Sequence, residues 1–362
     1  MKVLTITLHS LNNPGSVLQA FALQSFLLKN GYNTEIIDYR PQYILYEGNK
    51  IKALAKKILF YHDIKKREKK FDLFINNYLK LTANRFYSYE ELKNNTPVAD
   101  CYITGSDQLW NSSYDCGRDV SYYLGFVNTK YKLSYAVSAG KRDIPEDKLE
   151  WIYKNIKKFY WVSVRENSTK INLEKKGMKN IDYVCDPVLL LDKNQYLAMK
   201  EDIKINDKYI AVYLVQKSEM LDALIKFLKN RFNYKIVLLG GTTKRCKCDI
   251  HITDLGPKEF LGWIEGAEFI IASSFHATVF STIFQKKFAV LLPNGNGTRI
   301  EQYLEMANIK NRVIRNMEDI PKVLDKIEYN TDCTLRINSF ITYSKKRLLG
   351  TLNKIEKELL ED

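Results

Sequence analysis

The segment at residues 271–280 combines residue types suited to proton transfer and anion binding. An apolar run leads there to Ser274, and His276 then opens a second apolar run with helical spacing. An imidazole exchanges a proton near neutral pH. The first N–H groups of a helix, here those of Ala277 and Thr278, lack partners within the helix and attract anions. The pattern predicts that His276 acts on an anionic ligand. Ser274 as a simple helix cap beside a buried histidine would also fit it.

Two arginines stand where they could complement such a ligand. Arg165 ends the apolar run at residues 161–164, and its planar guanidinium suits two-point contact with a carboxylate or phosphate. An internal ion pair with Glu166 is the competing interpretation. Arg299 follows a glycine-containing loop from which it would reach across a cleft, and an ordinary surface arginine explains its position equally well.

Residues 103–111 place a glycine turn, a carboxylate, two amides and an indole directly behind an apolar run. Sugars need paired polar contacts and one flat apolar face, so this mixture predicts a carbohydrate-binding surface. A turn capped by aspartate, with Trp110 buried, accounts for the same residues. The side chains that we assign to substrate binding here are those of Ser106, Asp107, Gln108, Trp110 and Asn111.

Residues 12–16 form another loop that leads into a helix, where Gly15 and Ser16 would help to hold an anion. One glycine is a weak signal. The chain contains neither G-x-G-x-x-G nor a Walker sequence, which disfavours dinucleotide binding and NTP hydrolysis. Cys246, Cys248 and His251 lack a fourth ligand at zinc spacing, so we predict no metal site.

These segments need a scaffold that brings the ends of several strands together. Apolar runs that end in small or polar residues alternate with helical patterns, which is typical of parallel α/β sheets with ligands at the carboxyl ends of the strands. The expected strands are at residues 3–8, 33–37, 101–104, 133–138, 161–164, 181–185, 209–215, 235–239, 269–272 and 289–292. The sequence therefore predicts an α/β fold of two Rossmann-like domains, residues 1–190 and 191–335, facing each other across a cleft. A C-terminal helix at residues 336–362 is expected to pack back on them.

The first domain carries an insertion at about residues 42–96, with helical periodicity and clustered positive charge. Basic residues dominate residues 50–70, opposite an apolar helical face. The apolar positions of that face are Ile51, Leu54, Ala55 and Ile58. A helix lying on an anionic membrane would have this pattern, and so would a packed helix with a solvated outer face.

Composition and charge narrow the class of protein. With 362 residues, 45% apolar and 27% charged, the chain is typical of a globular protein of about two domains. A net charge of +14 favours anionic partners. The basic stretches lack interleaved aromatic residues, so no nucleic-acid partner is expected. We find no signal-peptide pattern and no apolar stretch near the ~18 residues of a membrane span. We expect a cytoplasmic protein, with peripheral contact at the inner, anionic membrane face as a further hypothesis.

Seven segments, taken in order, resemble the polysaccharide pyruvyl transferase family. They are residues 15–23 (GSVLQAFAL), 36–41 (IIDYRP), 105–111 (GSDQLWN), 134–138 (SYAVS), 163–166 (SVRE), 186–190 (DPVLL) and 273–276 (SSFH). Each is weak alone, but the ordered set is specific and runs from residue 15 to 276. Ser138, at the end of the fourth segment, joins the predicted substrate-binding residues.

The resemblance implies a two-domain fold similar to GT-B glycosyltransferases. It also implies an activity: pyruvate moves from phosphoenolpyruvate onto two hydroxyls of one sugar as a ketal, in an exopolysaccharide or a secondary cell-wall polymer. The family histidine falls on His276 and the family arginine on Arg165. We therefore expect phosphoenolpyruvate and a glycan or lipid-linked oligosaccharide as partners, and no cofactor. Arg299 would help Arg165 to neutralise the donor.

The chain departs from the family at two points. Some members have Arg-Leu-His where this chain has Ser274, Phe275 and His276, so Arg299, Lys141 or another group would replace that arginine, or the donor differs. The loop at residues 12–16 also lacks the expected aromatic-Gly form. Two alternatives stay open: a GT-B-like glycosyltransferase that uses a nucleotide sugar, and a non-catalytic glycan-assembly protein at the membrane.

Overall fold

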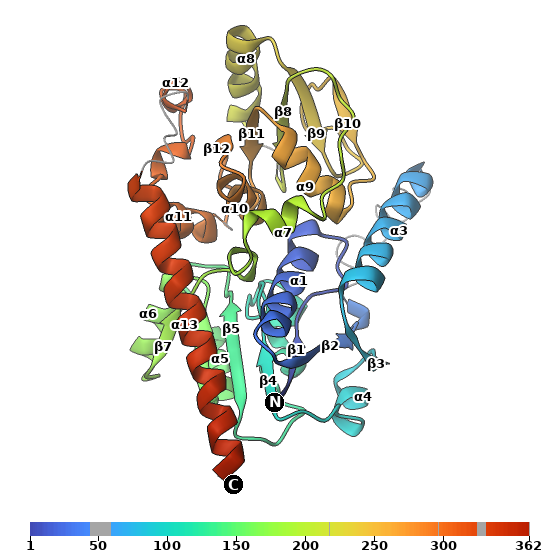
Figure 1. The fold of residues 1–362 in the computed structure, drawn as a ribbon. Coiled ribbons are helices and arrows are strands. Elements are labelled where there is room, and N and C mark those ends of the chain that lie inside the picture. Colours follow the sequence, from blue (N-terminus) through green and yellow to red (C-terminus); the bar gives the residue numbers. More distant parts are fainter. Residues whose placement is uncertain (44–58, 217, 296, 324–330, 362) are drawn as a thin grey trace.

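Two parallel sheets, one in each half of the chain, organise the protein in a computed structural model (Figure 1). The structure describes residues 1–43, 59–216, 218–295, 297–323 and 331–361. The apolar face predicted at Ile51, Leu54, Ala55 and Ile58 lies outside these residues.

The first sheet has the strand order β3-β2-β1-β4-β5-β6-β7, and neighbouring strands run parallel. Its strands are β1 (Lys2–Ile6), β2 (Asn33–Tyr39), β3 (Leu81–Phe86), β4 (Cys101–Thr104), β5 (Lys132–Val137), β6 (Trp161–Val164) and β7 (Ile181–Tyr183). Its helices are α1 (Pro14–Lys29), α3 (Tyr61–Tyr78), α4 (Tyr89–Asn94), α5 (Glu146–Ile156) and α6 (Asn167–Lys175).

The second sheet has the order β10-β9-β8-β11-β12 and is also parallel. Its strands are β8 (Tyr209–Tyr213), β9 (Lys235–Leu239), β10 (Ile250–Ile252), β11 (Phe269–Ala272) and β12 (Lys287–Val290). The helices of this half are α7 (Lys193–Leu197), α8 (Met220–Phe232), α9 (Pro257–Gly266), α10 (Phe275–Ile283), α11 (Thr298–Met306) and α12 (Asp319–Lys322).

Both sheets reverse their winding at one strand. In the first sheet β1 lies between β2 and β4, and in the second β8 lies between β9 and β11. Loops that leave neighbouring strands at such a point diverge and open a crevice at the carboxyl ends. The fold thus provides two crevices, one from each half, as the sequence pattern predicts.

The strands of both sheets are apolar in sequence because they are buried. Every residue of β4, β6 and β11 is buried, as expected of parallel strands covered on both faces. Twelve of the 16 residues of α1 are also buried, because α1 contacts β2 of its own sheet and α9 of the second half. Figure 1 shows α1 in the first half, directly below α9 and α7.

The insertion is not purely helical, which corrects the sequence prediction. Between α3 and α4 it contributes β3, which pairs with β2 at the edge of the first sheet. Helix α3 also reaches the second half. Asp63 Oδ2 accepts a hydrogen bond of 2.8 Å from Thr253 Oγ1, and Lys70 Nζ lies 2.9 Å from carboxylates of Asp254 and Glu259.

The final helix, α13 (Thr331–Glu361), runs back along the first half (Figure 1). Asp182 binds it through Tyr343, 2.5 Å away, and Arg347, 2.7 Å away. Ser344 Oγ accepts a hydrogen bond of 2.9 Å from the Cys185 amide. The predicted packing of the C-terminal helix is therefore confirmed, while the domain boundaries stay predictions. Among the described residues, no helix combines the length and apolar character that a membrane span requires.

Candidate active site

A cleft of about 410 Å³ opens where the two crevices face each other. The first half lines it with Leu8, Leu11, Asn13, Ser16, Tyr43, Asp107, Gln108, Tyr114, Asp115 and Cys116. The second half contributes Val215, Gln216, Ser273, Ser274, Phe275, His276, Pro293 and Arg299. These residues follow β1, β2, β4, β8, β11 and β12, so the cleft lies at the carboxyl ends of both sheets.

His276 sits in the first turn of α10, which begins after Ser274. Its side chain is buried, and its Nε2 lies 3.6 Å from Asp186 Oδ2, too far for a hydrogen bond. Nε2 has no other hydrogen-bond partner among the described residues. The Nδ1 edge lies beside Gly15, where an added Cβ would overlap the imidazole. Glycine at this position therefore leaves room for the ring at the cleft.

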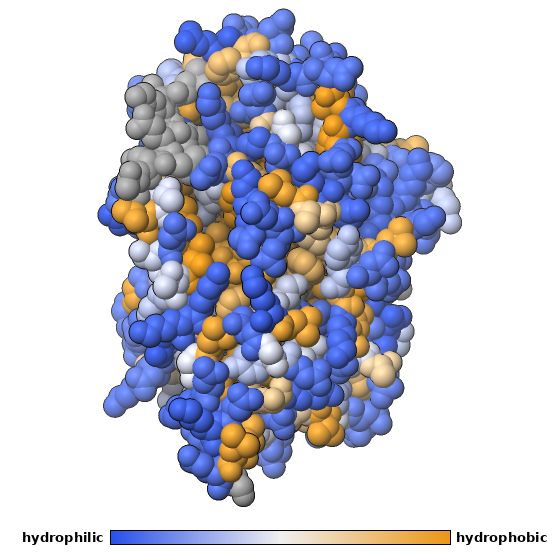
Figure 2. Space-filling view, viewed as in Figure 1, coloured by the Kyte–Doolittle hydropathy of each residue, from blue (hydrophilic) through white to orange (hydrophobic). Residues whose placement is uncertain are grey.

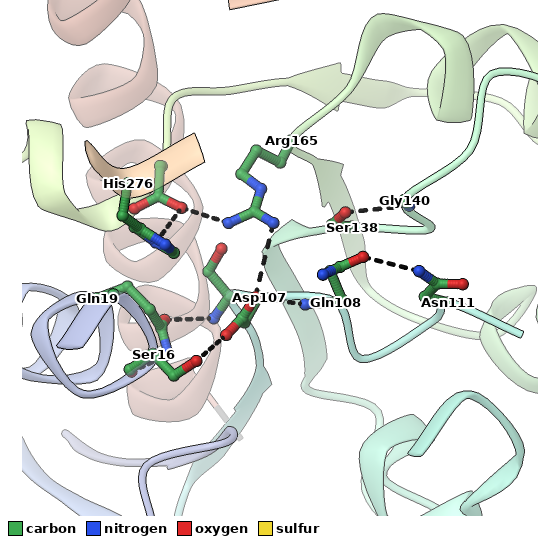
Figure 3. Close-up of polar contacts among 12 residues, drawn as sticks. Ser16, Gln19, Asp107, Gln108, Asn111, Ser138, Gly140, Arg165 and His276 are labelled. Carbon is green, nitrogen blue, oxygen red and sulfur yellow. Dashed lines mark hydrogen bonds and ion pairs between the residues drawn. The ribbon is translucent and has the colours of Figure 1, made fainter. Parts of the chain in front are cut away.

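A buried ion-pair network holds the Nε2 side of His276 (Figure 3). Arg165 Nη1 donates to Asp186 Oδ2 over 2.6 Å, Arg165 Nε lies 3.4 Å from Glu166 Oε1, and its Nη2 lies 3.7 Å from Asp107 Oδ1. Burial alone would raise the pKa of Asp186, but His276 and Arg165 outweigh it and hold that pKa well below its usual range. Asp186 therefore stays ionised and faces the imidazole.

Phe275 lies close to both arginines of the site. The Arg165 guanidinium is 4.6 Å from the centre of its ring and that of Arg299 is 6.0 Å away. Arg299 lines the cleft and has no carboxylate within ion-pair distance among the described residues. Burial, and secondarily the charge of Arg165, lower the pKa of Arg299. A guanidinium held in this way is stabilised by an incoming anion.

The loop after β4 forms the opposite wall. Asp107, with φ of 76°, lies in the left-handed region and accepts a 2.6 Å hydrogen bond from Ser16 Oγ. Burial raises the pKa of Asp107, but the charges of Arg165 and His276 lower it further, and the net shift is downward. Gln108 lies 2.7 Å from the Asn111 amide (Figure 3). Turning the Gln108 oxygen towards Arg299 places it 3.1 Å from Nη2.

The structure brings together eight of the residues predicted from sequence. Gly15, Ser16, Asp107, Gln108, Ser274, His276 and Arg299 line or adjoin the cleft, and Arg165 lies behind His276 without lining it. Arg165 is thus placed to position other groups. Lys141, the alternative cation, is not among the residues that line the cleft.

Trp110 does not offer the flat face that the sequence predicts. Its ring is 1% exposed and stacks on Tyr123 with centres 5.8 Å apart. Apolar packing in the first half explains this, and Tyr114 is the aromatic residue of the same loop that lines the cleft.

Three other predicted residues are turned inward. Ser106 donates from Oγ to the Ala136 carbonyl, Ser138 accepts from the Gly140 amide, and Asn111 is fully buried. These side chains shape the loop wall and do not line the cleft.

At two helix starts, α10 and α1, the backbone N–H groups that the sequence predicts for anion binding already have partners or are buried. Thr278 N–H donates to Ser274 O over 3.1 Å, so it is used within α10, and Ala277 is fully buried. At α1, the Asn13 side chain already accepts from the amides of Gly15 and Ser16, at 2.9 and 3.4 Å. Ser274 makes no side-chain cap, which removes the simple capping interpretation.

Sequence reasoning missed Asp186, Phe275 and Asn13 as parts of the site. Asp186 follows β7, so the rule that polar residues after strands face ligands was available for it. Phe275 and Asn13 gave no such signal. Among the described residues, Cys246, Cys248 and His251 included, no three His, Cys, Asp or Glu side chains group in a way that would hold a metal ion.

Solved structures with the same arrangement of two halves resemble this chain. UDP-GlcNAc 2-epimerase from Neisseria meningitidis bound to UDP-GlcNAc has a TM-score of 0.53 at 14% identity, covering 98% of this chain and 100% of its own. UDP-N-acetylglucosamine 2-epimerase from Rickettsia bellii has a TM-score of 0.54 at 11% identity, covering 99% and 97%. Glycyrrhiza uralensis UGT73P12, complexed with glycyrrhetinic acid 3-O-monoglucuronide, has a TM-score of 0.52 at 10% identity, covering 100% and 97%. They confirm the GT-B-like fold.

Comparison of sequences identifies a family, whereas the solved structures show the fold alone. The sequence model of the family described as polysaccharide pyruvyl transferase matches residues 13–295. That range includes both walls of the cleft except Arg299 and the residues before Asn13. No curated protein matches the chain at a significant level.

Proposed function

The chain belongs to the polysaccharide pyruvyl transferase family, and on that premise we propose that it transfers pyruvate from phosphoenolpyruvate to two hydroxyls of a sugar as a ketal. The acceptor is a cell-surface polysaccharide, such as an exopolysaccharide or cell-wall polymer, or its lipid-linked precursor. The site needs no metal or redox cofactor for this chemistry. We further propose that the enzyme works in the cytoplasm, with its basic surface towards the inner membrane face.

One observation supports this proposal above the others. The His276 imidazole has its Nε2 edge directed at the ionised Asp186, 3.6 Å away, and its Nδ1 edge beside Gly15 at the cleft. A carboxylate on one side of an imidazole orients the ring and stabilises its charged form, leaving the other nitrogen to exchange a proton. His276 is accordingly our general acid and base, and Arg165 keeps Asp186 in place.

The second half also offers positive charge for the anionic donor. Phosphoenolpyruvate carries a carboxylate and a phosphate. Arg299 lines the cleft without a carboxylate partner among the described residues, and Ser274 lines the same cleft with a hydroxyl that makes no side-chain cap. The N-terminus of α10 adds a favourable dipole. We propose that Arg299 takes the role of the arginine that Ser274 replaces.

The reaction then proceeds in two additions. His276 protonates C3 of the enol, C2 becomes electrophilic, and the first sugar hydroxyl forms a C–O bond there as it loses its proton. Phosphate leaves with the electrons of its bond to C2, and the second hydroxyl closes the ketal as it loses its own proton. Of the two hydroxyl protons, one replaces the proton given to C3 and the other leaves on phosphate. The imidazole can carry both transfers.

The first half is suited to the acceptor. Ser16, Asp107 and Gln108 present a hydroxyl, a carboxylate and an amide to the cleft, and Tyr114 gives it a half-buried ring. This combination of polar pairs and an aromatic face is what a sugar requires. Tyr114 takes the part that the sequence prediction gave to Trp110.

Phosphate release tests the proposal. The full chain is incubated with phosphoenolpyruvate and candidate glycans, and free phosphate is measured together with the mass of the glycan. We expect phosphate only when a suitable acceptor is present, one equivalent per ketal formed. If phosphoenolpyruvate neither shifts the melting temperature nor yields phosphate with any acceptor, the proposal fails.

A nucleotide sugar as donor is the second candidate, because the Neisseria meningitidis structure of the same fold holds UDP-GlcNAc. The same thermal-shift screen separates the two donors. A shift with UDP-GlcNAc or another nucleotide sugar, and none with phosphoenolpyruvate, would favour a glycosyltransferase. A glycan-assembly protein without catalysis would bind glycan and keep that function after His276→Ala.

A further inference from the structure

A second pocket, of about 160 Å³, adjoins the loop that carries Gln108. We call it the Trp151 pocket. Its lining comes from the segment after β4 and from one face of α5, and consists of Trp110, Ser112, Gly117, Arg118, Asp147, Lys148, Trp151 and Ile152. None of these residues lines the cleft, so the two pockets are separate sites.

Aromatic rings give the Trp151 pocket an apolar wall. Trp151 is 38% exposed, whereas Trp110 and Ile152 line the pocket from the core and are almost completely buried. Tyr123 contacts both indoles: its ring stacks on Trp110 with centres 5.8 Å apart and meets Trp151 edge to face at 6.4 Å. Trp151 is thus an open ring held by packing, and such a ring binds a flat ligand at a low cost in conformational entropy.

Exposure sets Trp151 apart from the other tryptophans. Most of the surface in Figure 2 is hydrophilic, with hydrophobic side chains dispersed among the others. Single exposed apolar side chains are ordinary in a folded protein. Of the four tryptophans, however, only Trp151 is exposed, and it opens onto a pocket. Its position therefore indicates a ligand with an apolar face.

Polar groups line the same pocket. Ser112 contributes a half-buried hydroxyl, Arg118 an exposed guanidinium and Asp147 an exposed carboxylate. Lys148, 2.6 Å from Asp147, holds the pKa of that carboxyl below its usual value, so Asp147 is ionised. A sugar ring has C–H groups on its faces and hydroxyls around its edge, which an indole and paired polar side chains complement.

Size limits the ligand to a single ring. Pockets for drug-sized ligands start at about 300 Å³, and the Trp151 pocket has about half of that volume.

One loop forms a wall of both sites. Gln108 and Tyr114 line the cleft, whereas Ser112 and Gly117 of the same loop line the Trp151 pocket. A Cβ on Gly117 would overlap the Asn111 carbonyl oxygen, so the loop folds back tightly on itself. A chain of sugars that leaves the cleft over this loop therefore reaches the Trp151 pocket.

We propose that the Trp151 pocket is a second sugar-binding subsite, which holds a ring of the acceptor glycan other than the ring that receives the ketal. This inference rests on the proposed function for its role in the reaction. In that role, one ring of the glycan lies in the cleft and another lies against Trp151. Affinity then depends on acceptor length, because only a chain of several rings occupies both sites at once.

Glycan binding without phosphoenolpyruvate tests the subsite directly. Linear hexasaccharides of glucose, galactose, mannose and N-acetylglucosamine are titrated into the full chain, and calorimetry and tryptophan fluorescence are recorded. We expect at least one of them to bind and to change the fluorescence. Trp151→Ala should weaken that binding roughly three- to tenfold, the loss expected for one stacking contact. If no hexasaccharide binds, or if Trp151→Ala binds as the wild type does, the subsite is refuted.

Three further variants make this test specific. Tyr87→Ala removes another exposed aromatic ring of the first half, which lies outside the Trp151 pocket, and should leave glycan binding unchanged. Trp151→Phe keeps a flat ring and should retain part of the affinity. Arg118→Gln removes a polar partner at the pocket and should weaken binding as well. The last two variants carry the test if Trp151→Ala fails to fold, and melting temperatures establish which variants are folded.

Kinetics with long and short acceptors show whether the subsite serves the reaction. Trp151→Ala should raise KM for a long acceptor roughly three- to tenfold, and should leave kcat, KM for phosphoenolpyruvate and KM for a single sugar unchanged. An equal rise in KM for the single sugar would mean that Trp151 acts through the loop on the cleft, and our proposal would be wrong.

Two other outcomes are distinguished by the same variants. If Trp151→Ala turns a dimer into a monomer by light scattering and leaves glycan affinity intact, Trp151 binds a second copy of the chain and the subsite is refuted. Should phosphoenolpyruvate yield no phosphate with any acceptor, the proposed function fails, while the loss of glycan binding in Trp151→Ala still reports on the subsite.

Discussion

His9 and His276 each face an aspartate with two arginines nearby, and the cluster of His276 also contains Asp107 and Glu166. In the first cluster His9 Nε2 is 3.0 Å from Asp38 Oδ1 and its Nδ1 is 3.2 Å from the Thr7 carbonyl oxygen. In the second, His276 Nε2 lies 3.6 Å from Asp186 and makes no hydrogen bond. His9 is completely buried, whereas His276 borders the cleft.

The arginines differ in the same way. Arg40 and Arg85 both donate to Asp38, over 2.5 and 2.8 Å, so every charge of the first cluster has a partner. In the second cluster Arg165 satisfies Asp186, but Arg299 has no carboxylate within ion-pair distance among the described residues. Satisfied polar groups stabilise a fold, and unsatisfied ones at a cleft indicate a place for ligand. Three pairs of variants across the two clusters, and a comparison at two pH values, test that distinction.

Replacing the imidazole should give the largest effect. His276→Gln is expected to lower kcat by about 10²- to 10⁴-fold, the usual contribution of a general acid or base, with little change in melting temperature. His9→Gln should do the reverse, because it breaks two buried contacts and leaves the cleft intact. Phosphate release per folded molecule and thermal melts measure both. Equal losses of activity would contradict the comparison.

Removing the aspartate charge should lower the free energy of unfolding more at Asp186 than at Asp38. Asp186→Asn leaves Arg165, whose side chain is 2% exposed, without its main partner and should cost about 3–5 kcal/mol in the free energy of unfolding. Asp38→Asn should cost less, because Arg40 and Arg85 are 23% and 46% exposed and water can replace the carboxylate. Urea unfolding gives both values. A larger loss for Asp38→Asn would overturn this ranking.

Replacing the unpaired arginine should affect the donor alone. Arg299→Met is expected to raise KM for phosphoenolpyruvate roughly 10- to 100-fold, since a hydrogen bond to a charged group contributes about 1.5–3 kcal/mol. The free energy of unfolding should change little, because the variant removes a half-buried cation that pairs with no described carboxylate. Arg85→Met is the control and should leave KM unchanged. Initial rates over a range of phosphoenolpyruvate concentrations decide the matter.

Lowering the pH should have the smallest effect, a change in how much more stable the wild type is than Asp186→Asn. Burial raises the pKa of Asp186, but His276 and Arg165 lower it further, so its folded pKa lies below its unfolded value. Its stabilising effect is therefore complete above about pH 4 and declines as the pH falls through the folded pKa. The gap in unfolding free energy between wild type and Asp186→Asn should narrow by about 1 kcal/mol per pH unit below pH 4. Urea unfolding at pH 3 and pH 6 checks this, and a widening gap would refute the sign.

Much of the fold could be predicted from the sequence, because each buried parallel strand is an apolar run that ends in polar residues. His276 and Asp107 could be placed at the cleft by the same rule, whereas the sequence left Arg299 equally open to a role in the cleft and to an ordinary surface position. The partners of these residues could not be predicted. Ser16 and Asp107 are 91 positions apart in the chain, and Asp186 and His276 come together only when both halves have folded. Sequence patterns report local periodicity and carry no signal for such pairs.

The sequence also could not predict which side chains of a loop face the core and which face the cleft. Trp110 and Gln108 belong to one loop, yet Trp110 enters the core and Gln108 faces Arg299. The choice depends on the turn at Gly105 and Asp107, with φ angles of 127° and 76°, which reverse the alternation expected of an extended segment. β3 was missed for a similar reason. Its pattern has only two buried positions, as an edge strand allows.

Helix α13 has a consequence for how the protein is made. The ribosome synthesises it after the entire second half, yet its contacts to Asp182 and Cys185 belong to the first. Until α13 has been synthesised, the surface of the first half that binds it stays exposed to solvent, where chaperones can bind it or aggregation can begin. A first half expressed by itself would lack this cover, so the two halves are separate in architecture but joined in biogenesis.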